Sequence, residues 1–210
     1  MNEPYWFHVH TNVTDGSLSI EEVFKQAHAR GVKTLVFLEH IRREPTYDVS
    51  GWETEVRLFA EEYRLDTLVG FEAKILPEGE LDIDPEDFER ADLIGIAEHG
   101  FPENLTLFMD AWEEVMDDAA TWCKKKPAVW VHPGLFFRKY RLIESHFDEY
   151  KMLLQKAHER GVHLEYNLRY NLMERSLLGE YPHLTGIDLH QESDIARWEQ
   201  FAAKEMMASA

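Results

Sequence analysis

The chain has 210 residues, 44% of them hydrophobic, and a formal net charge of −18 at pH 7. This length is enough for one large domain with a substantial core, and we expect a single domain over residues 1–210. The strong negative charge repels phosphate backbones, so it disfavours a nucleic acid as the partner.

Cysteine usage and hydropathy indicate the cytoplasm. Cys123 is the only cysteine, so no disulfide can form within the chain, and its place in a predicted helix favours a structural role. The first residues contain neither the basic nor the apolar segment of a signal peptide, and no apolar run has the length of a membrane span. We therefore expect a cytoplasmic protein without a membrane partner.

Seven strand-length apolar segments alternate with segments of helical character. The expected strands cover residues 5–7, 32–38, 67–71, 92–97, 128–131, 162–166 and 184–187. The main expected helices cover residues 20–27, 51–63, 105–119 and 143–160, and a last helix carries Ile195, Trp198 and Phe201. Ser19 and Glu22 have the spacing of a capping box before the first helix. The alternation predicts a parallel α/β fold.

The first expected strand leads into two histidines. His8 and His10 are two residues apart, so strand alternation places both imidazoles on one face. A neutral imidazole is a common metal ligand. Asp15 follows in a turn closed by Gly16 and can add a carboxylate. Such a pair can also be ordinary surface or core histidines, so the remaining strands decide between the two interpretations.

The other expected strands also end in metal-binding side chains. These are His40 after the second strand, Glu72 after the third, His99 after the fourth, His132 after the fifth, and Asp188 and His190 after the seventh. Six of the eleven histidines thus stand at expected strand ends. In a parallel barrel these ends share one mouth, where active sites lie. The distribution favours a metal centre over scattered structural histidines.

Together these motifs resemble the PHP (polymerase and histidinol phosphatase) family. The matching motifs, in the family's order, are His8-x-His10 with Asp15-Gly16, Glu39-His40, Glu72 in Gly-Phe-Glu-Ala, His99, His132-Pro-Gly and Asp188-x-His190. The family usually has Asp-His in place of Glu39-His40 and Ser-Asp-Ala-His in place of Ile187-Asp-Leu-His190, but the coordinating side-chain types are kept.

The resemblance implies a distorted seven-stranded (β/α)7 TIM-like barrel with two or three divalent ions of Zn, Mn or Fe. The implied metal ligands are His8, His10, Asp15, His40, Glu72, His99, His132, Asp188 and His190. It also implies metal-dependent hydrolysis of a phosphate ester, in which adjacent ions lower the pKa of a water molecule that attacks phosphorus.

A phosphate monoester also favours guanidinium groups, which bind its oxygens in pairs. The candidates on the mouth side are Arg42, Arg43, Arg138 and Arg169. A surface ion pair is the alternative role for each single arginine, but we expect at least one to contact phosphate. Asn167, in a Glu165-x-Asn167 segment like the family's, is expected to orient a ligand or the substrate. Lys74 and Asp82 flank the loop at residues 76–85 and are candidates for shaping the pocket.

Three functions remain open from the sequence. The first is hydrolysis of a small phosphomonoester, as in a histidinol phosphatase. The second is a phosphodiesterase or nuclease acting on nucleotides or DNA ends, which the acidic charge disfavours. The third is a non-catalytic metal-binding module, which the complete set of candidate ligands disfavours.

Overall fold

Seven parallel strands close into a barrel in the computed structural model, which describes residues 3–170, 172, 175–178 and 181–208. The strands are β1 (Tyr5–Val9), β2 (Thr34–His40), β3 (Asp66–Lys74), β4 (Ile94–Ala97), β5 (Ala128–Trp130), β6 (His163–Asn167) and β7 (His183–Leu189). Each strand pairs with the next one in the sequence, and β1 also pairs with β7, which closes the barrel. The predicted seven-stranded β/α barrel is therefore confirmed.

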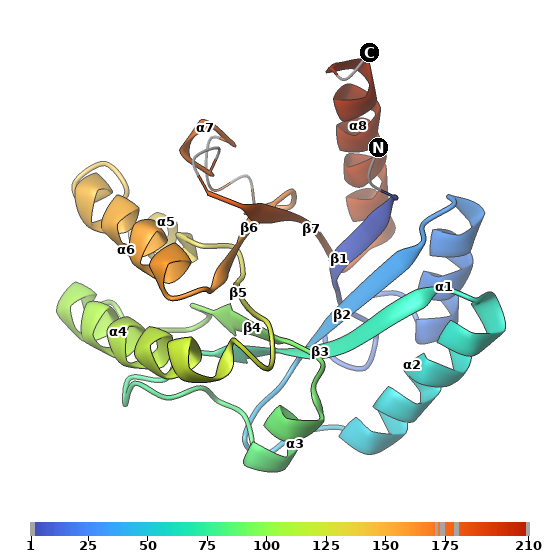
Figure 1. Ribbon diagram of the computed structural model, residues 1–210, viewed down its shortest axis with the longest axis horizontal. Coiled ribbons are helices and arrows are strands. Elements are labelled where there is room, and N and C mark those ends of the chain that lie inside the picture. The colour runs from blue at the N-terminus through green and yellow to red at the C-terminus, as the bar shows by residue number, and fades with distance from the viewer. Residues whose placement is uncertain (1–2, 171, 173–174, 179–180, 209–210) are drawn as a thin grey trace.

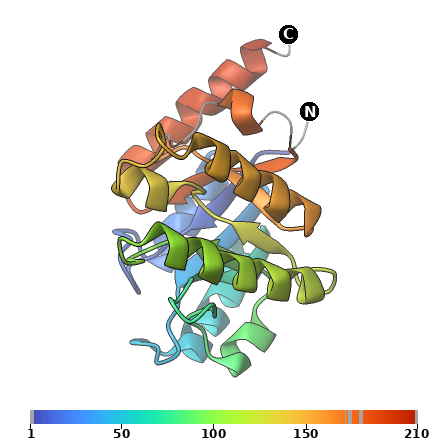
Figure 2. The same cartoon turned by 90° about the vertical axis from the view of Figure 1, so that its left-hand side faces the viewer.

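Helices surround this barrel on its outside (Figure 1). They are α1 (Ile20–Ala29), α2 (Val49–Tyr63), α3 (Pro85–Arg90), α4 (Leu105–Trp122), α5 (Leu135–Lys139), α6 (Phe147–Glu159), α7 (Arg175–Leu178) and α8 (Glu192–Ala208). Figure 2 shows α4 and α6 side by side along one flank, where Lys156 and Arg160 of the α6 end pair with Glu113. None of the helices in the described part of the chain has the length and hydropathy that a membrane crossing requires.

The helices after β5 differ most from the sequence prediction. The helix expected over residues 143–160 begins only at Phe147, because the backbone of His146 is not helical. The short helix α5 was not predicted at all. The predicted capping box of α1 is present, since the Ser19 hydroxyl accepts from the Glu22 N–H and the Glu22 side chain reaches back to Ser19.

Buried side chains form two separate layers, as strand alternation requires. On β2, Leu35 and Phe37 pack between the strands and the helices, whereas Val36 and Leu38 belong to a small cluster inside the barrel. The next inward position of β2 is therefore His40. On β3, Phe71 and Ala73 join the outer layer, so Glu72 between them points into the barrel. At its open end the barrel interior therefore contains a carboxylate instead of a hydrophobic side chain.

A β-bulge in β1, and not simple alternation, turns both histidines of the first strand inward. Phe7 belongs to the interior cluster and Val9 to the outer layer. The register of β1 against both β2 and β7 shifts between these two residues, and His8 between them has φ 71°. With Phe7 inward, regular alternation would point His8 and His10 outward. The extra residue of the bulge places both histidines on the interior side.

Candidate metal centre

The structure brings all nine predicted metal ligands to one end of the barrel. They come from the ends of β1, β2, β3 and β7 and from the loops after β1, β4, β5 and β7. Among the described residues, their ligand atoms form four overlapping groups within 4.8 Å. The groups are His10, Asp15, His40 and His190; His8, His10 and Asp188; His8, Glu72 and His132; and His40, Glu72 and His99.

Glu72 lies at the middle of this cluster. Its Oε1 atom is 2.6 Å from His132 Nε2 and 2.8 Å from His99 Nε2. Its Oε2 atom is 2.8 Å from His40 Nδ1 and 3.7 Å from His8 Nε2. The carboxylate therefore belongs to two of the four groups and would supply a ligand to an ion held by either.

Two aspartates complete the cluster on the side of β1 and β7. Asp15, in the loop after β1, lies 3.3 Å from His40 Nε2 and 3.2 Å from His190 Nε2. Asp188 lies 3.1 Å from His190 Nδ1 and 3.8 Å from His10 Nε2. Asp188 is buried, whereas the Asp15 side chain is 54% exposed, so Asp15 marks the solvent side of the centre.

Unpaired buried atoms indicate that the cluster fits metal ions. His8 Nε2 and both ring nitrogens of His10 are buried and form no hydrogen bond. Leaving such atoms unpaired costs about 1–3 kcal/mol each, so they are rare without a further partner. Imidazole nitrogens and carboxylate oxygens together suit Zn, Mn and Fe. The donor set and its unpaired atoms therefore match the divalent ions that the sequence predicts.

The protonation of the histidines depends on their carboxylate neighbours. Burial lowers the pKa of His10 to about 4, so its imidazole is neutral at pH 7. Burial would also lower the pKa of His40, but contacts with Asp15 and Glu72 raise it to about 10. At His190 burial is likewise outweighed by Asp15 and Asp188, which raise the pKa to about 9. In the metal-free protein at neutral pH, these two histidines therefore carry a proton.

Metal binding is expected to release protons at about pH 7, because a coordinating imidazole must be neutral. Since His40 and His190 are protonated below a pH of about 9, protons compete with the metal, and the apparent metal affinity should rise as the pH approaches that value. Isothermal titration calorimetry in two buffers with different ionisation enthalpies measures the released protons. The control is metal diluted into each buffer alone. Equal binding enthalpies in both buffers would contradict the prediction.

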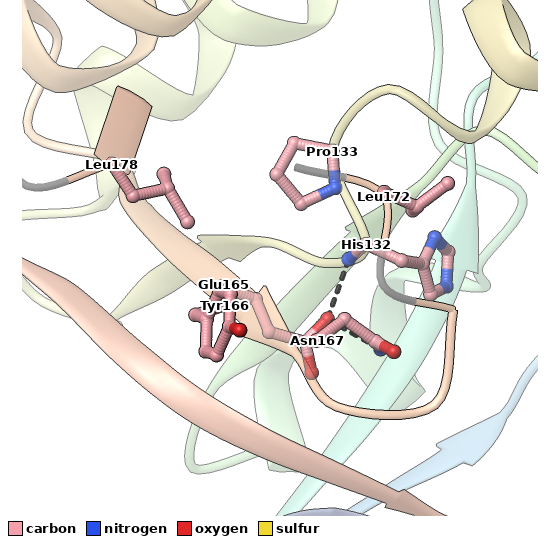
Figure 3. A pocket seen from close by; sticks show the side chains of 7 residues that line it. All are labelled: His132, Pro133, Glu165, Tyr166, Asn167, Leu172 and Leu178. Atoms are coloured by element: carbon pink, nitrogen blue, oxygen red, sulfur yellow. Dashed lines mark hydrogen bonds between the residues drawn. The ribbon is translucent and has the colours of Figure 1, made fainter. Parts of the chain in front are cut away.

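Glu165 on β6 holds two of the candidate ligands in place. Its Oε1 atom lies 2.8 Å from His8 Nδ1, and its Oε2 atom accepts from the His132 N–H at 2.5 Å. Contact of Nδ1 with Glu165 leaves His8 Nε2 facing Glu72, 3.7 Å from its Oε2 atom, where it would coordinate a metal ion once deprotonated. Figure 3 shows Glu165 between His132 and Asn167, beside a small pocket that Pro133 also lines. In the sequence, Glu165 is recognisable only as part of the Glu165-x-Asn167 segment, which does not predict these contacts.

Glu39 holds the loop that carries Asp15. This buried carboxylate accepts from Thr11 N at 2.9 Å and from Thr11 Oγ1 at 2.7 Å, and it also accepts from the Thr14 hydroxyl. The sequence showed Glu39 only as a departure from the family's Asp-His pair. Thr11 and Thr14, the partners of Glu39, lie in the loop after β1, so no pattern within β2 could indicate that Glu39 holds this loop.

Arg169 is the predicted phosphate contact that lies nearest to the cluster. Its Nη1 atom is 3.9 Å from Asp188 Oδ1, and this nitrogen is buried without a hydrogen bond. Asn167 fixes the segment, because its Oδ1 atom accepts from the N–H groups of Arg169 and Tyr170, both at 2.9 Å. Asn167 Nδ2 also donates to Asp188 Oδ2 at 3.0 Å. Arg138 donates to the Tyr170 carbonyl and so supports the same segment.

The other predicted arginines pair with the loop that follows β3. Arg42 Nε lies 3.6 Å from Asp82 Oδ2, and Lys74 Nζ lies 3.3 Å from the same atom. The Arg43 guanidinium pairs with Glu80, and the backbone N–H of Arg43 donates to Asp82 Oδ1 at 3.1 Å. In the described part of the chain, Arg169 is the one of the four that pairs with a candidate metal ligand.

Comparison with known proteins agrees with this architecture. The family model of the PHP domain matches residues 7–197. A candidate histidinol phosphatase from Listeria monocytogenes has a similar structure, with a TM-score of 0.61 and 16% sequence identity, over 92% of this chain and 97% of that one. A two-domain protein from Bacteroides vulgatus with a predicted PHP-like metal-dependent phosphoesterase has a TM-score of 0.51 and 16% identity, over 90% of this chain and 53% of that one.

No curated protein matches the chain in sequence. At such low identity the two solved structures show the fold alone, and the family model carries the assignment because it spans most of the chain. The protein belongs to the PHP domain family, whose members include metal-dependent phosphoesterases.

Proposed function

We propose that the protein hydrolyses a small phosphate monoester with the help of two or three divalent ions. One observation carries the proposal: nine imidazole and carboxylate side chains meet within four overlapping groups, and several of their buried atoms form no hydrogen bond. When bound, the ions would supply Lewis-acid activation of water and of the phosphoryl oxygens. The groups that share Glu72 would hold neighbouring ions.

The protein side chains would orient the substrate and balance its charge. Arg169 stands beside Asp188, and its buried Nη1 atom forms no hydrogen bond, so the guanidinium can donate to a phosphate oxygen near the centre. The backbone contacts of Asn167 restrict the position of Arg169, which lowers the entropy lost on binding. Glu165 keeps the His8 ring in one orientation. In this proposal the attacking group is a water molecule, so no protein side chain acts as the nucleophile.

A small monoester is favoured over a polynucleotide as the substrate. A monoester presents more charged terminal oxygens than a diester, and these suit a guanidinium beside a cluster of cations. The net charge of −18 opposes binding of a long phosphate backbone. The name of the Listeria protein makes histidinol phosphate one monoester to include among the substrates tested.

Turnover of p-nitrophenyl phosphate and of bis-p-nitrophenyl phosphate, with Mn²⁺ or Zn²⁺ added, tests this function. We expect the protein to hydrolyse the monoester faster than the diester and to lose activity with a chelator. Arg169→Met keeps the apolar stem and removes the guanidinium, so it should lower kcat/KM for the monoester by roughly 10²-fold. Arg57→Met is the matched control, since Arg57 pairs with Glu53 and Asp92 on the outside of the barrel.

Three results would count against the proposal. A metal-loaded protein that hydrolyses neither ester would refute a phosphoesterase activity with these substrates. Turnover of the diester alone would favour a phosphodiesterase or nuclease. An Arg169→Met variant with unchanged kinetics would show that another group contacts the phosphate.

A further inference from the structure

The sequence Glu-His occurs at the ends of two strands. In both cases the histidine is a candidate metal ligand, whereas the glutamate accepts hydrogen bonds from a neighbouring loop. In Glu39-His40 and in Glu98-His99, the histidine belongs to a candidate metal group. Both glutamates are buried, with exposed fractions of 0% and 2%. Glu39 accepts hydrogen bonds from the loop that carries Asp15. Glu98 has no role in the function proposed above.

Glu98 binds the turn that follows β5. Its Oε1 atom accepts from the Gly134 N–H at 3.1 Å, and its Oε2 atom accepts from the Phe136 N–H at 2.5 Å. Among the described residues, no lysine or arginine forms an ion pair with Glu98. A buried carboxylate without a cation is costly, and these two backbone donors offset part of that cost. Both carboxylate oxygens of Glu98 therefore accept hydrogen bonds from the same turn, the one after β5.

That turn carries His132 and has an unusual backbone. His132 has φ 31° and Gly134 has φ 96°, so two positions adopt the left-handed region. A non-glycine residue there is strained unless its surroundings hold it. Tyr150 Oη donates to the Pro133 carbonyl at 2.9 Å, and Glu165 accepts from the His132 N–H. Three side chains from different elements therefore fix three consecutive residues of the turn.

We propose that Glu98 is a positioning residue for the metal centre. Through the chain it is joined to His99, and through its hydrogen bonds it is joined to the turn of His132. The Nε2 atoms of these two histidines lie 2.8 and 2.6 Å from the same oxygen, Glu72 Oε1. Glu98 thus sets the distance between the segments that bring His99 and His132 to Glu72. Glu39 does the same for His40 and Asp15 on the other side of the centre.

This inference depends on the proposed metal centre, and a Co²⁺ titration of the metal-free protein tests both separately. The visible absorption of bound Co²⁺ reports the ligand geometry, independently of activity. Glu98→Gln puts an amide N–H₂ opposite a backbone N–H, and Glu98→Asp keeps the charge but is too short for both bonds. Each variant should weaken Co²⁺ binding by roughly tenfold or more, as loss of a ligand-supporting contact does, and should shift the spectrum.

Asp48→Ala is the matched control. The Asp48 carboxylate also accepts from a backbone N–H at the start of a helix, that of Gly51 in α2, but it touches no candidate ligand. This variant should lower the melting temperature and leave the Co²⁺ spectrum unchanged. If the Glu98 variants do not fold, Tyr150→Phe decides, because it removes one bond to the same turn and keeps the ring. It should shift the spectrum in the same direction.

The outcomes are distinct. Spectral shifts and weaker binding in the Glu98 variants, or in Tyr150→Phe where those do not fold, support the inference. A lower melting temperature with an unchanged spectrum and affinity would overturn it and leave Glu98 as a purely structural residue. A native protein that binds no Co²⁺ would instead refute the metal centre itself.

Discussion

Glu72→Gln is expected to remove at least one metal ion per chain and nearly all hydrolysis of a phosphate monoester. The carboxylate lies within 2.8 Å of nitrogens of His40, His99 and His132, and it belongs to two of the four candidate groups. Glutamine keeps the volume but loses the charge and one acceptor. Because Glu72 would supply a ligand to the ions of both groups, kcat/KM for p-nitrophenyl phosphate should fall on the order of 10³-fold. Elemental analysis of the dialysed protein measures the bound metal.

The same change should destabilise the metal-free protein. Burial alone would raise the pKa of Glu72, but the surrounding histidines outweigh it and hold this pKa well below its usual range. A lowered carboxylate pKa contributes stability above the group's usual pKa, and this contribution is lost as the pH falls through the folded-state value. At neutral pH, removing this buried charge should cost about 3–5 kcal/mol in the free energy of unfolding, measured with urea.

Glu80→Gln is the control for Glu72, because Glu80 is an exposed carboxylate that pairs with Arg43 at the rim. It should leave the metal content and the stability close to those of the native protein. A Glu72→Gln protein with full metal content would contradict the central position that the geometry gives to this residue.

The sequence predicts the parallel α/β fold and most of the candidate ligands because both depend on short-range patterns, whereas the closed barrel and the complete ligand set were implied by the family resemblance. A strand that is covered on both faces is a continuous apolar run, so the strands at 32–38 and 128–131 can be recognised without their partners. The ends of parallel strands meet at one mouth. Residues that follow these runs, such as His40 and His132, can therefore be placed together from the sequence alone.

The direction of His8 and His10 could not be predicted in the same way. Alternation correctly suggests that the two share a face, but it does not say which face. That depends on the irregularity between Phe7 and Val9, where β1 gains a residue against β2 and β7 gains one against β1. A bulge is a property of the pairing, and nothing in the segment 5–10 alone marks it.

The supporting contacts of Glu165 and Glu98 could not be predicted for a related reason. Glu165 contacts His8, which is 157 residues away in the sequence, and Glu98 binds a turn that begins more than 30 residues later. Local patterns indicate which face of a strand a residue occupies, but not which loop of a neighbouring strand it reaches. The contact of Glu165 with His8 follows from the closed barrel, in which β7 pairs with both β6 and β1, and that of Glu98 follows from the pairing of β4 with β5.

Gly186→Ala is expected to disrupt the centre although residue 186 is no ligand. A Cβ atom at this position of β7 would lie 1.7 Å from Glu165 Oε1 and 2.5 Å from Glu165 Cδ. The Glu165 carboxylate would have to move, which breaks its bonds to His8 Nδ1 and the His132 N–H. We expect metal affinity to fall roughly 10–100-fold, as with other ligand-supporting contacts. Overpacking should also lower the free energy of unfolding by about 1–3 kcal/mol.

A double-mutant cycle separates displacement of Glu165 from a general packing defect. If the new methyl group acts by moving Glu165, then Glu165→Ala alone should reduce metal affinity as much, and adding Gly186→Ala to it should cost little more. Gly95→Ala is the control, because its Cβ would meet only Leu38 and Val131 methyl groups at 3.3 Å. It should affect stability without affecting metal affinity. Additive effects of the two substitutions would mean that the space at Gly186 matters for another reason than the placement of Glu165.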